Sequence, residues 1–290
     1  MITPELLSSL EIDFQQKGAE FILDCPYCGK DRHLYLNQSG VFKCHHCQEA
    51  GGWSKLRKEY GEGAPGIQEP KEKTVTLPTE AYISGCQKKL LGPNGTPVVE
   101  YLYSRKITLD QIHKYQLGMD MKEGKPVLVI PILEDGKVVN VKYRSIPPAE
   151  KKYFRFQGGK SALFNGDILK GLKPDDLVCL TEGEMDCISL SGLGVNAAGI
   201  TGGAGTIIPA WIKQLEKPEK IYLVYDSDEP GQKGAREIAR RLGMERCFNI
   251  VLPAKDVNQW VMNGGTKEAF GDLVRNARRF DIENVCTTET

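Results

Sequence analysis

Two cysteine pairs near the amino terminus have the spacing of a metal site. Cys25 and Cys28 form one Cys-x-x-Cys pair, and fifteen residues later Cys44 and Cys47 form a second. Each pair can supply two thiolates to one tetrahedral Zn²⁺, with a hairpin between the pairs. Two redox or disulfide pairs are the alternative. Because a segment of about sixty residues with few large apolar side chains needs a staple to fold, we predict one structural zinc ion.

Two histidines stand inside the second cysteine pair. His45 or His46 could replace a cysteine as a zinc ligand. If the four cysteines complete the zinc shell, these imidazoles and the nearby aromatic and basic residues could instead stack on single-stranded nucleic acid. A role in surface solubility is the alternative for them.

Acidic side chains follow three short apolar segments in the carboxyl-terminal half. Glu182 ends the first segment, Asp226 and Asp228 end the second, and Asp256 follows the third. Open α/β sheets keep their active sites at the carboxyl ends of their strands. On an extended backbone, residues two apart project from the same face. Glu182, Asp226 and Asp228 are therefore predicted to converge on hard divalent cations, Mg²⁺ or Mn²⁺. A helix N-cap or a turn is the alternative role for any one acid.

A basic stretch lies between positions 139 and 160. It contains six Lys or Arg residues and only one acidic residue, and aromatic residues lie among them. The six cations are Lys142, Arg144, Lys151, Lys152, Arg155 and Lys160. A groove for single-stranded nucleic acid and triphosphates needs this composition, and a solvated charged face is the alternative. The segment Gly158–Ser161 is no P-loop, because position 154 is phenylalanine where a glycine is required. We therefore predict no helicase motor in this chain.

The elements that must position these residues differ between the two halves of the chain. Residues 1–22 are predicted to be helical, and residues 79–118 helical with a break at LGPNGTP. Residues 127–143 are predicted to form a hairpin around an Asp135-Gly136 turn. From about residue 171, short apolar strands alternate with helices, which favours a mostly parallel sheet covered by helices. The strands expected there are 177–180, 221–225 and 248–252.

The chain is therefore predicted to be α/β, or α+β overall, with several parts. Gly, Pro and alternating charge between residues 61 and 78 indicate an extended linker. The parts are a zinc ribbon at 1–60, the linker at 61–78, a basic subdomain at 79–170, a parallel-sheet subdomain at 171–265, and a carboxyl-terminal helix and tail at 266–290.

The acidic motifs resemble a known signature. Glu182-Gly-Glu-Met-Asp186 together with Asp226-Ser-Asp228-Glu-Pro-Gly231 resembles the Toprim signature. A four-cysteine zinc ribbon, a linker and a Toprim domain in this order are similar to the DnaG-type primases, most closely the primase half of phage primase–helicases. Other segments that resemble family landmarks are Tyr101–Ile107, in which Lys106 stands where glycine is usual, Tyr115–Gly118, Lys142–Arg144 through Phe164-Asn165, and Lys255–Asn258.

The resemblance implies roles for particular residues. Glu182, Asp226 and Asp228 would be the principal Mg²⁺-site acids, with Asp186 and Asp256 nearby. The implied nucleotide-phosphate contacts are Lys142, Arg144 and Lys152, and the zinc ribbon would read a short template sequence.

The function implied by the resemblance is synthesis of short RNA primers from ribonucleoside triphosphates on a single-stranded DNA template. A replicative helicase is the expected partner, either in trans or on a missing carboxyl-terminal part. Two alternatives remain: a Toprim-type metal-dependent nuclease that uses the same acids, and a non-catalytic DNA-binding recombination mediator. A mediator of that type typically lacks the full acid set, which is present here.

Composition bounds the cellular setting. The 290 residues are 26% charged and 40% hydrophobic, which is typical of a folded globular chain, and 38 basic residues balance 38 acidic ones. The net charge therefore indicates no partner. No apolar run approaches the ~18–20 residues of a membrane span, and the amino terminus lacks the pattern of a signal peptide. Only four of nine cysteines are in paired spacing, which favours a reducing compartment. We expect a cytoplasmic protein of a bacterial or phage-infected cell.

Overall fold

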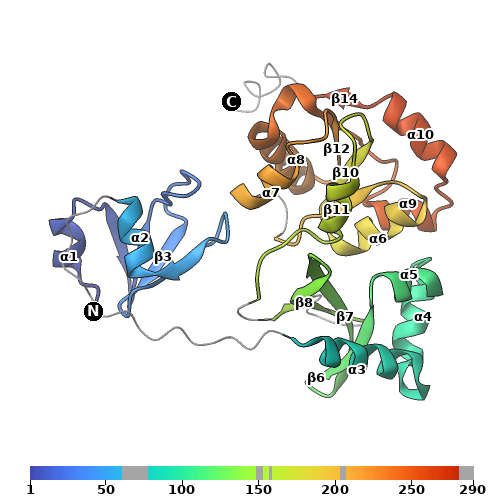
Figure 1. Ribbon diagram of the computed structural model, residues 1–290, viewed down its shortest axis with the longest axis horizontal. Coiled ribbons are helices and arrows are strands. Elements are labelled where there is room, and N and C mark those ends of the chain that lie inside the picture. Colours follow the sequence, from blue (N-terminus) through green and yellow to red (C-terminus); the bar gives the residue numbers. More distant parts are fainter. Residues whose placement is uncertain (61–77, 148–152, 157–158, 203–206, 281–290) are drawn as a thin grey trace. The chain divides into compact units, whose positions relative to one another are not determined.

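The computed structural model describes residues 1–60, 78–147, 153–156, 159–202 and 207–280 (Figure 1). The chain divides into two compact units, of which the first consists mainly of Met1–Thr74 and the second of Val75–Gly205 with Pro209–Thr290. Apart from Pro78, the predicted linker lies outside the described residues.

The amino-terminal unit is built on a five-stranded antiparallel sheet in the order β1-β2-β3-β4-β5. Its core contains the fully buried side chains of Phe21, Phe42 and Trp53. The predicted hairpin between the cysteine pairs is confirmed as β3 and β4. The elements are α1 (Pro4–Ser9), β1 (Phe14–Lys17), β2 (Glu20–Leu23), β3 (Leu34–Asn37), β4 (Val41–Cys44), β5 (Ala50–Gly52) and α2 (Trp53–Glu59).

The prediction of a helix over residues 1–22 is wrong beyond its first turns. The helix is confined to Pro4–Ser9, and the backbone turns at Glu11 with a φ of 56°. The residues after this turn pair as β1 and β2, and Phe14 packs edge-on against Phe21 with ring centroids 5.5 Å apart. The apolar spacing of the first ten residues is helical, but pairing of β2 with β3 decides the conformation of the rest.

The second unit begins with helices that lead into a four-stranded antiparallel sheet, β6-β7-β8-β9. The predicted hairpin is confirmed, because β7 and β8 flank the two-residue turn Asp135-Gly136, whose φ values of 54° and 71° suit a type I′ turn. The predicted helical region is confirmed as α3, α4 and α5 with its break at η1, but a second break at 105–108 separates α4 from α5, and Gly118 begins a strand. The elements are α3 (Glu80–Leu91), η1 (Pro93–Gly95), α4 (Thr96–Ser104), α5 (Leu109–Lys114), β6 (Gly118–Lys122), β7 (Lys125–Glu134), β8 (Lys137–Ser145) and β9 (Tyr153–Arg155).

Strand β8 presents different side chains on its two faces. The Tyr143 hydroxyl lies 3.1 Å from the hydroxyl of Tyr82 on α3. Lys142 and Arg144 contact residues of α6 and α4 instead. Since successive side chains of a strand point to opposite faces, this single strand aims two cations away from α3 and toward the rest of the unit.

The remainder of the second unit is a five-stranded sheet in the order β11-β10-β12-β13-β14. The first four strands are mutually parallel, and β14 is antiparallel to β13. The predicted mostly parallel sheet is confirmed, but the strand expected at 248–252 ends at Asn249, so Asp256 does not directly follow a strand. The elements are η2 (Gly166–Gly171), β10 (Val178–Thr181), α6 (Glu184–Gly192), β11 (Ala197–Gly199), α7 (Pro209–Gln214), β12 (Ile221–Val224), α8 (Glu229–Leu242), η3 (Met244–Arg246), β13 (Cys247–Asn249), α9 (Val257–Met262), α10 (Lys267–Arg275) and β14 (Arg278–Arg279).

The strand order reverses direction at β10. The chain passes from β10 through α6 to β11 on one side, and then returns to place β12 and β13 on the other side of β10. Right-handed crossovers therefore put α6 and α8 on opposite faces of the sheet, as Figure 1 shows. The carboxyl ends of β10 and β12 flank this switch point, where open α/β sheets bind ligands.

The described helices are short. The longest, α8, has 14 residues, and none of the helices in the described part of the chain combines the length and the apolar character needed to cross a membrane.

Candidate functional site

The four predicted zinc ligands lie together in the amino-terminal unit. Their Sγ atoms all lie within 4.8 Å of one another, with 3.7 Å between Cys25 and Cys47 and 3.9 Å between Cys28 and Cys44. A tetrahedron of thiolates about 2.3 Å from a zinc ion has edges of about 3.8 Å. All four are free thiols. The cluster therefore fits one Zn²⁺, and the alternative of two disulfides is not what the structure contains.

Histidines surround this cluster without entering it. Among the described residues the ligand cluster consists of cysteines alone. The exposed ring of His45 lies edge-on to the ring of Tyr35, with their centroids 4.5 Å apart. The ring centroids of His33 and His46 are 5.9 Å apart. The substitution of a histidine for a cysteine ligand is thus not supported, and the imidazoles instead form two edge-on ring pairs, one with Tyr35 and one between His33 and His46.

Glu182 follows the last residue of β10 at the switch point of the parallel sheet. Its carboxylate is half-buried, and one oxygen accepts a hydrogen bond from the Asp226 backbone while Oε2 is buried without a hydrogen-bond partner. Burial, followed by the charges of Asp226 and Asp228, raises the pKa of Glu182 to about 7. An unpaired buried oxygen among like charges is a position that a cation would stabilise.

The loop after β12 is held against the loop after β13. The Ser227 backbone N–H donates to the Lys255 carbonyl at 2.8 Å, and its hydroxyl donates to the Ala254 carbonyl at 2.7 Å. Asp228 is exposed and caps α8, since its Oδ1 accepts the Gly231 N–H at 3.0 Å. This acid therefore fills the alternative N-cap role as well as standing at the predicted edge.

The remaining two acids lie on the α6 and α9 side of the same edge. Asp256 also caps a helix, accepting the Gln259 N–H at 2.7 Å. Asp186 accepts the Asn258 backbone N–H at 3.1 Å. Burial, and next the charge of Asp256, raises the pKa of Asp186 to about 7. All five predicted acids are thus brought to one edge of the sheet or to the helix starts beside it.

A divalent cation fits this donor set. The acids supply hard carboxylate oxygens. The negative charges of Asp226 and Asp228 oppose the ionisation of Glu182, and Glu182 Oε2 is buried without a hydrogen-bond partner. Among the described residues, only the four thiols form a group whose ligand atoms all lie within 4.8 Å of one another. The carboxylate oxygens of the acids are therefore more widely spaced. Such openness suits Mg²⁺, which usually keeps several waters and uses one or two carboxylates.

Of the three predicted phosphate contacts, Lys142 makes an ion pair inside the protein. Its Nζ donates to both carboxylate oxygens of Glu184, at 2.7 and 2.8 Å. The Glu184 side chain is 0% exposed and that of Lys142 is 13% exposed. Glu184 begins α6 and lies between Glu182 and Asp186 in sequence, so this ion pair ties β8 to the start of the acid-bearing helix.

Arg144, two residues further along the same face of β8, contacts α4. Its Nε donates to the Tyr101 hydroxyl at 2.7 Å, and its positive charge is one of the influences that lower the pKa of Asp186. Arg144 therefore lies near Asp186. The third residue, Lys152, lies outside the described residues.

Sequence reasoning assigned no role to three residues of this region. Glu184 stands inside the acidic motif, Tyr101 begins the segment that ends at Ile107, and Asn258 ends the segment Lys255–Asn258. Each is half-buried or buried and bonds a predicted site residue. The signal in the sequence that could have found these residues was their position within the motif segments. The bonding partner of each lies tens of residues away in the sequence, so the sequence did not indicate the contact.

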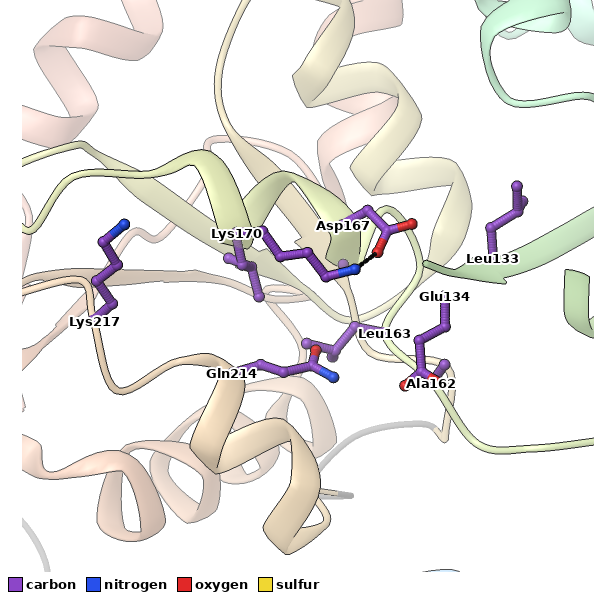
Figure 2. Close-up of a pocket in the computed structure, with 10 residues that line it drawn as sticks. Leu133, Glu134, Ala162, Leu163, Asp167, Lys170, Gln214 and Lys217 are labelled. Atoms are coloured by element: carbon purple, nitrogen blue, oxygen red, sulfur yellow. Dashed lines mark hydrogen bonds and ion pairs between the residues drawn. The ribbon is translucent and has the colours of Figure 1, made fainter. Parts of the chain in front are cut away.

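A separate cavity of about 200 Å³ lies between η2, α7 and the end of β7 (Figure 2). Its lining includes Leu133, Leu163, Leu169, Asp167, Lys170 and Gln214. The Lys170 ammonium is paired with Asp167. None of the residues predicted for the metal or phosphate sites lines this cavity, so it is distinct from the acid edge.

Comparison with known proteins places these features in context. A family model described as Toprim-like matches residues 179–261. The chain is 27% identical to the Twinkle homolog protein of Arabidopsis thaliana over 86% of its own length but only 38% of that protein, so it spans well under half of this relative. It is 24% identical to the primase homolog protein of the same plant, over 96% of this chain and 88% of that one. The gene 57 protein of Mycobacterium phage D29 is 30% identical over 44% of this chain and 82% of that protein.

Solved structures share the fold. The zinc-binding and RNA polymerase domains of the Aquifex aeolicus primase superpose with a TM-score of 0.57 at 18% identity, covering 97% of this chain and 84% of that one. The primase fragment of the bacteriophage T7 primase-helicase protein superposes with a TM-score of 0.52 at 20% identity, covering 90% of this chain and all (100%) of that fragment.

Proposed function

Because the chain belongs to the Toprim-containing primases of the DnaG type, we propose that it is a DNA-directed RNA polymerase that makes short RNA primers from ribonucleoside triphosphates on single-stranded DNA. The observation that carries this proposal is that two cations of β8 reach acids of α6, the helix that begins beside the carboxyl end of β10: Lys142 pairs with Glu184, and the charge of Arg144 acts on Asp186. Primer synthesis needs both, since metal and phosphate must be held together.

The proposed chemistry divides between acids and cations. Glu182, Asp226 and Asp228 would hold a divalent cation, which would supply activation of the attacking 3′-hydroxyl and charge neutralisation at the α-phosphate and the leaving pyrophosphate. Asp186 and Asp256 complete the acidic edge. Arg144, with Lys142 and Lys152, orients the triphosphates, so catalysis consists mainly of positioning and electrostatic stabilisation. No covalent protein intermediate is required.

The amino-terminal unit is proposed to hold the template. The four thiols would hold a zinc ion that would stabilise the ribbon, and the rings of His33, Tyr35, His45 and His46 offer stacking faces to unpaired bases. Residues 61–78 act as the linker that sets the effective concentration of this ribbon at the catalytic subdomains 79–170 and 171–265.

A replicative helicase is the proposed partner, either as a separate protein or on a carboxyl-terminal extension. Support comes from the T7 fragment, which is part of a primase-helicase protein. We propose that the protein acts in the cytoplasm of a bacterial or phage-infected cell.

The test is synthesis of labelled oligoribonucleotides on single-stranded DNA of varied sequence with Mg²⁺. Wild-type protein should make template-dependent products beginning with a dinucleotide. Asp226→Asn and Asp228→Asn should each reduce the rate by roughly two orders of magnitude or more, because each removes an anionic ligand while preserving size. Their circular dichroism spectra should match that of the wild-type protein.

The same reactions separate the proposal from its alternatives. A nuclease would degrade the DNA without ribonucleotides and would lose that activity in the same variants. A mediator would bind the DNA but would neither degrade it nor make oligoribonucleotides. Either result without oligoribonucleotides on any template would contradict the primase proposal.

A further inference from the structure

The helix α4 carries a residue to which the proposed mechanism gives no role. Tyr101 is half-buried on α4, and Arg105 directly follows the helix. Both belong to the segment Tyr101–Ile107, which the sequence singles out without a function. In the fold this segment lies between β8 and the acid edge, because its side chains bond residues of both.

Tyr101 holds the Arg144 side chain in one orientation. The phenolic oxygen accepts the hydrogen bond from Arg144 Nε at 2.7 Å. The guanidinium carbon lies 5.8 Å from the Tyr101 ring centroid, and that of Arg105 lies 5.6 Å from the same centroid. The contact uses the inner nitrogen Nε, whereas the terminal nitrogens of a guanidinium form the outer edge that meets a phosphate in a paired geometry.

The other end of the segment is fixed to the acid edge. Arg105 Nη1 donates to Asn258 Oδ1 at 2.9 Å, and Asn258 Nδ2 donates back to the Arg105 carbonyl at 2.9 Å and to Ser189 at 2.8 Å. The backbone N–H of Asn258 donates to Asp186. Asn258 is 2% exposed. One short stretch of chain therefore connects Arg144 to Asp186 through hydrogen bonds: Tyr101 bonds Arg144, and Arg105, four residues further on, bonds Asn258, whose backbone N–H bonds Asp186.

This connection has a consequence for ligand binding. An arginine side chain has considerable rotamer entropy to lose when it is ordered on a ligand. A side chain already ordered by a neighbour avoids part of that cost, which increases affinity without any new contact to the ligand. Loss of the ordering group should weaken binding while the chemical step is preserved.

We propose that Tyr101 is a positioning residue, whose hydroxyl orients Arg144 toward the triphosphate of the nucleotide while Arg105 and Asn258 hold the same segment at the acid edge. This inference rests on the proposed function, because it takes Arg144 to be a nucleotide-phosphate contact. Tyr101 itself touches no substrate.

The test compares Tyr101→Phe with Tyr103→Phe. The first change removes only the hydroxyl and keeps the ring, and the second removes a hydroxyl from a 50% exposed side chain on the same helix. Equilibrium binding of ATP with Mg²⁺ is measured by calorimetry, alongside KM, kcat and the melting temperature. For Tyr101→Phe we expect Kd and KM for the nucleotide to rise about tenfold, because the Arg144 side chain must then be ordered when the nucleotide binds. Its kcat, its half-saturating Mg²⁺ and its melting temperature should stay within experimental scatter, and Tyr103→Phe should match the wild-type protein throughout.

A double-mutant cycle shows whether Tyr101 acts through Arg144. In an Arg144→Ala background, Tyr101→Phe should have no further effect on nucleotide Kd, because the residue it positions is gone. An additive effect in that background would overturn the inference. So would an unchanged Kd in Tyr101→Phe, or a fall in melting temperature with all kinetic constants changed together, which indicates a structural role only.

The binding measurement also separates this inference from the primase proposal. Wild-type protein that binds ATP but makes no oligoribonucleotide would contradict the primase proposal, and a tenfold weaker Kd in Tyr101→Phe would still support the positioning role. Wild-type protein that binds no triphosphate would overturn the positioning role.

Discussion

At the scale of single residues, the acid edge contains carboxyl groups that resist ionisation. Glu182 keeps an oxygen buried without a partner, and burial together with Asp226 and Asp228 raises its pKa to about 7. Native protein therefore holds this proton up to about pH 7, whereas the unfolded chain releases it near the usual value of 4.5. Between these pH values the native state binds more protons, so the free energy of unfolding falls as pH rises.

The first residue-scale prediction compares the wild-type protein with the Glu182→Gln variant. Without added magnesium, the melting temperature of the wild-type protein should decrease more steeply between pH 4.5 and 7 than that of the variant, which has no proton to release there. At pH 8, Mg²⁺ should raise the melting temperature of the wild-type protein more than that of the variant. Thermal melts across pH, with and without Mg²⁺, measure both effects. Parallel curves of melting temperature against pH for the two proteins would contradict the raised pKa of Glu182.

The buried pair of Lys142 and Glu184 changes what is expected of the basic strand. Both residues lie within the protein, and the Glu184 carboxylate is 0% exposed. Removing one partner of a buried ion pair leaves an uncompensated charge and typically costs about 3–5 kcal/mol. Lys142 therefore has a structural role besides the phosphate contact proposed for it.

The second residue-scale prediction compares Lys142→Ala with Arg144→Ala. The first variant should lose about 3–5 kcal/mol of stability in urea denaturation, and a smaller loss is expected when Glu184→Gln is added, because the orphaned charge is then removed. Arg144→Ala should bind nucleotide more weakly with a much smaller loss of stability. Equal stabilities of the two single variants would show that the ion pair contributes little.

At the scale of elements, the strand-to-helix junctions fix the acids. Where α8 leaves the β12 loop, the helix passes so close to Asp226 that a Cβ on Gly231 would lie 2.4 Å from the Asp226 carbonyl oxygen. Gln232 donates to that same carbonyl at 3.0 Å. Ser227 holds the loop against residues 252–255. The carboxylate positions thus depend on close backbone packing.

The element-scale prediction is that Gly231→Ala displaces the loop that carries Asp226 and Asp228. Overpacking against backbone should cost about 1–3 kcal/mol, and the half-saturating Mg²⁺ concentration should rise. Gly85→Ala is the matched control, since Gly85 lies in α3 with nothing within 4 Å of an added Cβ. That variant should be stabilised by about 0.5–1 kcal/mol. Urea melts and Mg²⁺ titrations of primer synthesis measure both, and an unaffected Gly231→Ala protein would contradict the tight-junction argument.

At the scale of the whole molecule, the two units have separate cores. The core of the first unit gathers around Phe21, Phe42, Trp53 and the buried cysteines. The largest core of the second unit consists of residues between Leu90 and Phe270. The acids and the described cations of β8 belong to the second unit, whereas the thiols belong to the first. Template reading and nucleotide joining are therefore expected to be separable.

The whole-molecule prediction concerns a chain truncated to residues 79–290. It should still extend a short RNA primer annealed to DNA, because extension needs only metal, triphosphate and a 3′-hydroxyl. Primer initiation at preferred sites should largely disappear. Cys44→Ser in the full chain should lose zinc and reproduce this loss of site choice. Products are mapped on a template library, and zinc by elemental analysis. Unchanged start sites in the truncated protein would assign template reading to the second unit.

Several features were predictable from the sequence because they are local. The spacing of the four cysteines predicted the thiol cluster, since the geometry of a tetrahedral metal is encoded in two short pairs. The Asp135-Gly136 turn predicted the β7–β8 hairpin, because left-handed φ values favour these residues. Acids directly after apolar strands predicted the carboxyl-edge site, since parallel strands end at one side of a sheet.

Other features were decided only by tertiary structure. Residues 14–23 became strands because they pair with a neighbouring strand, against the helical spacing that precedes them. The bond between Lys142 and Glu184 joins residues 42 positions apart, and that between Arg105 and Asn258 joins residues 153 apart. No local pattern encodes such pairs, because a side chain acquires these partners only when packing of β8, α4 and α9 against the sheet brings them within hydrogen-bonding distance. The sequence alone therefore determined which chemical groups are present and which strand ends carry them, and the packed fold decided which of those groups bond to one another.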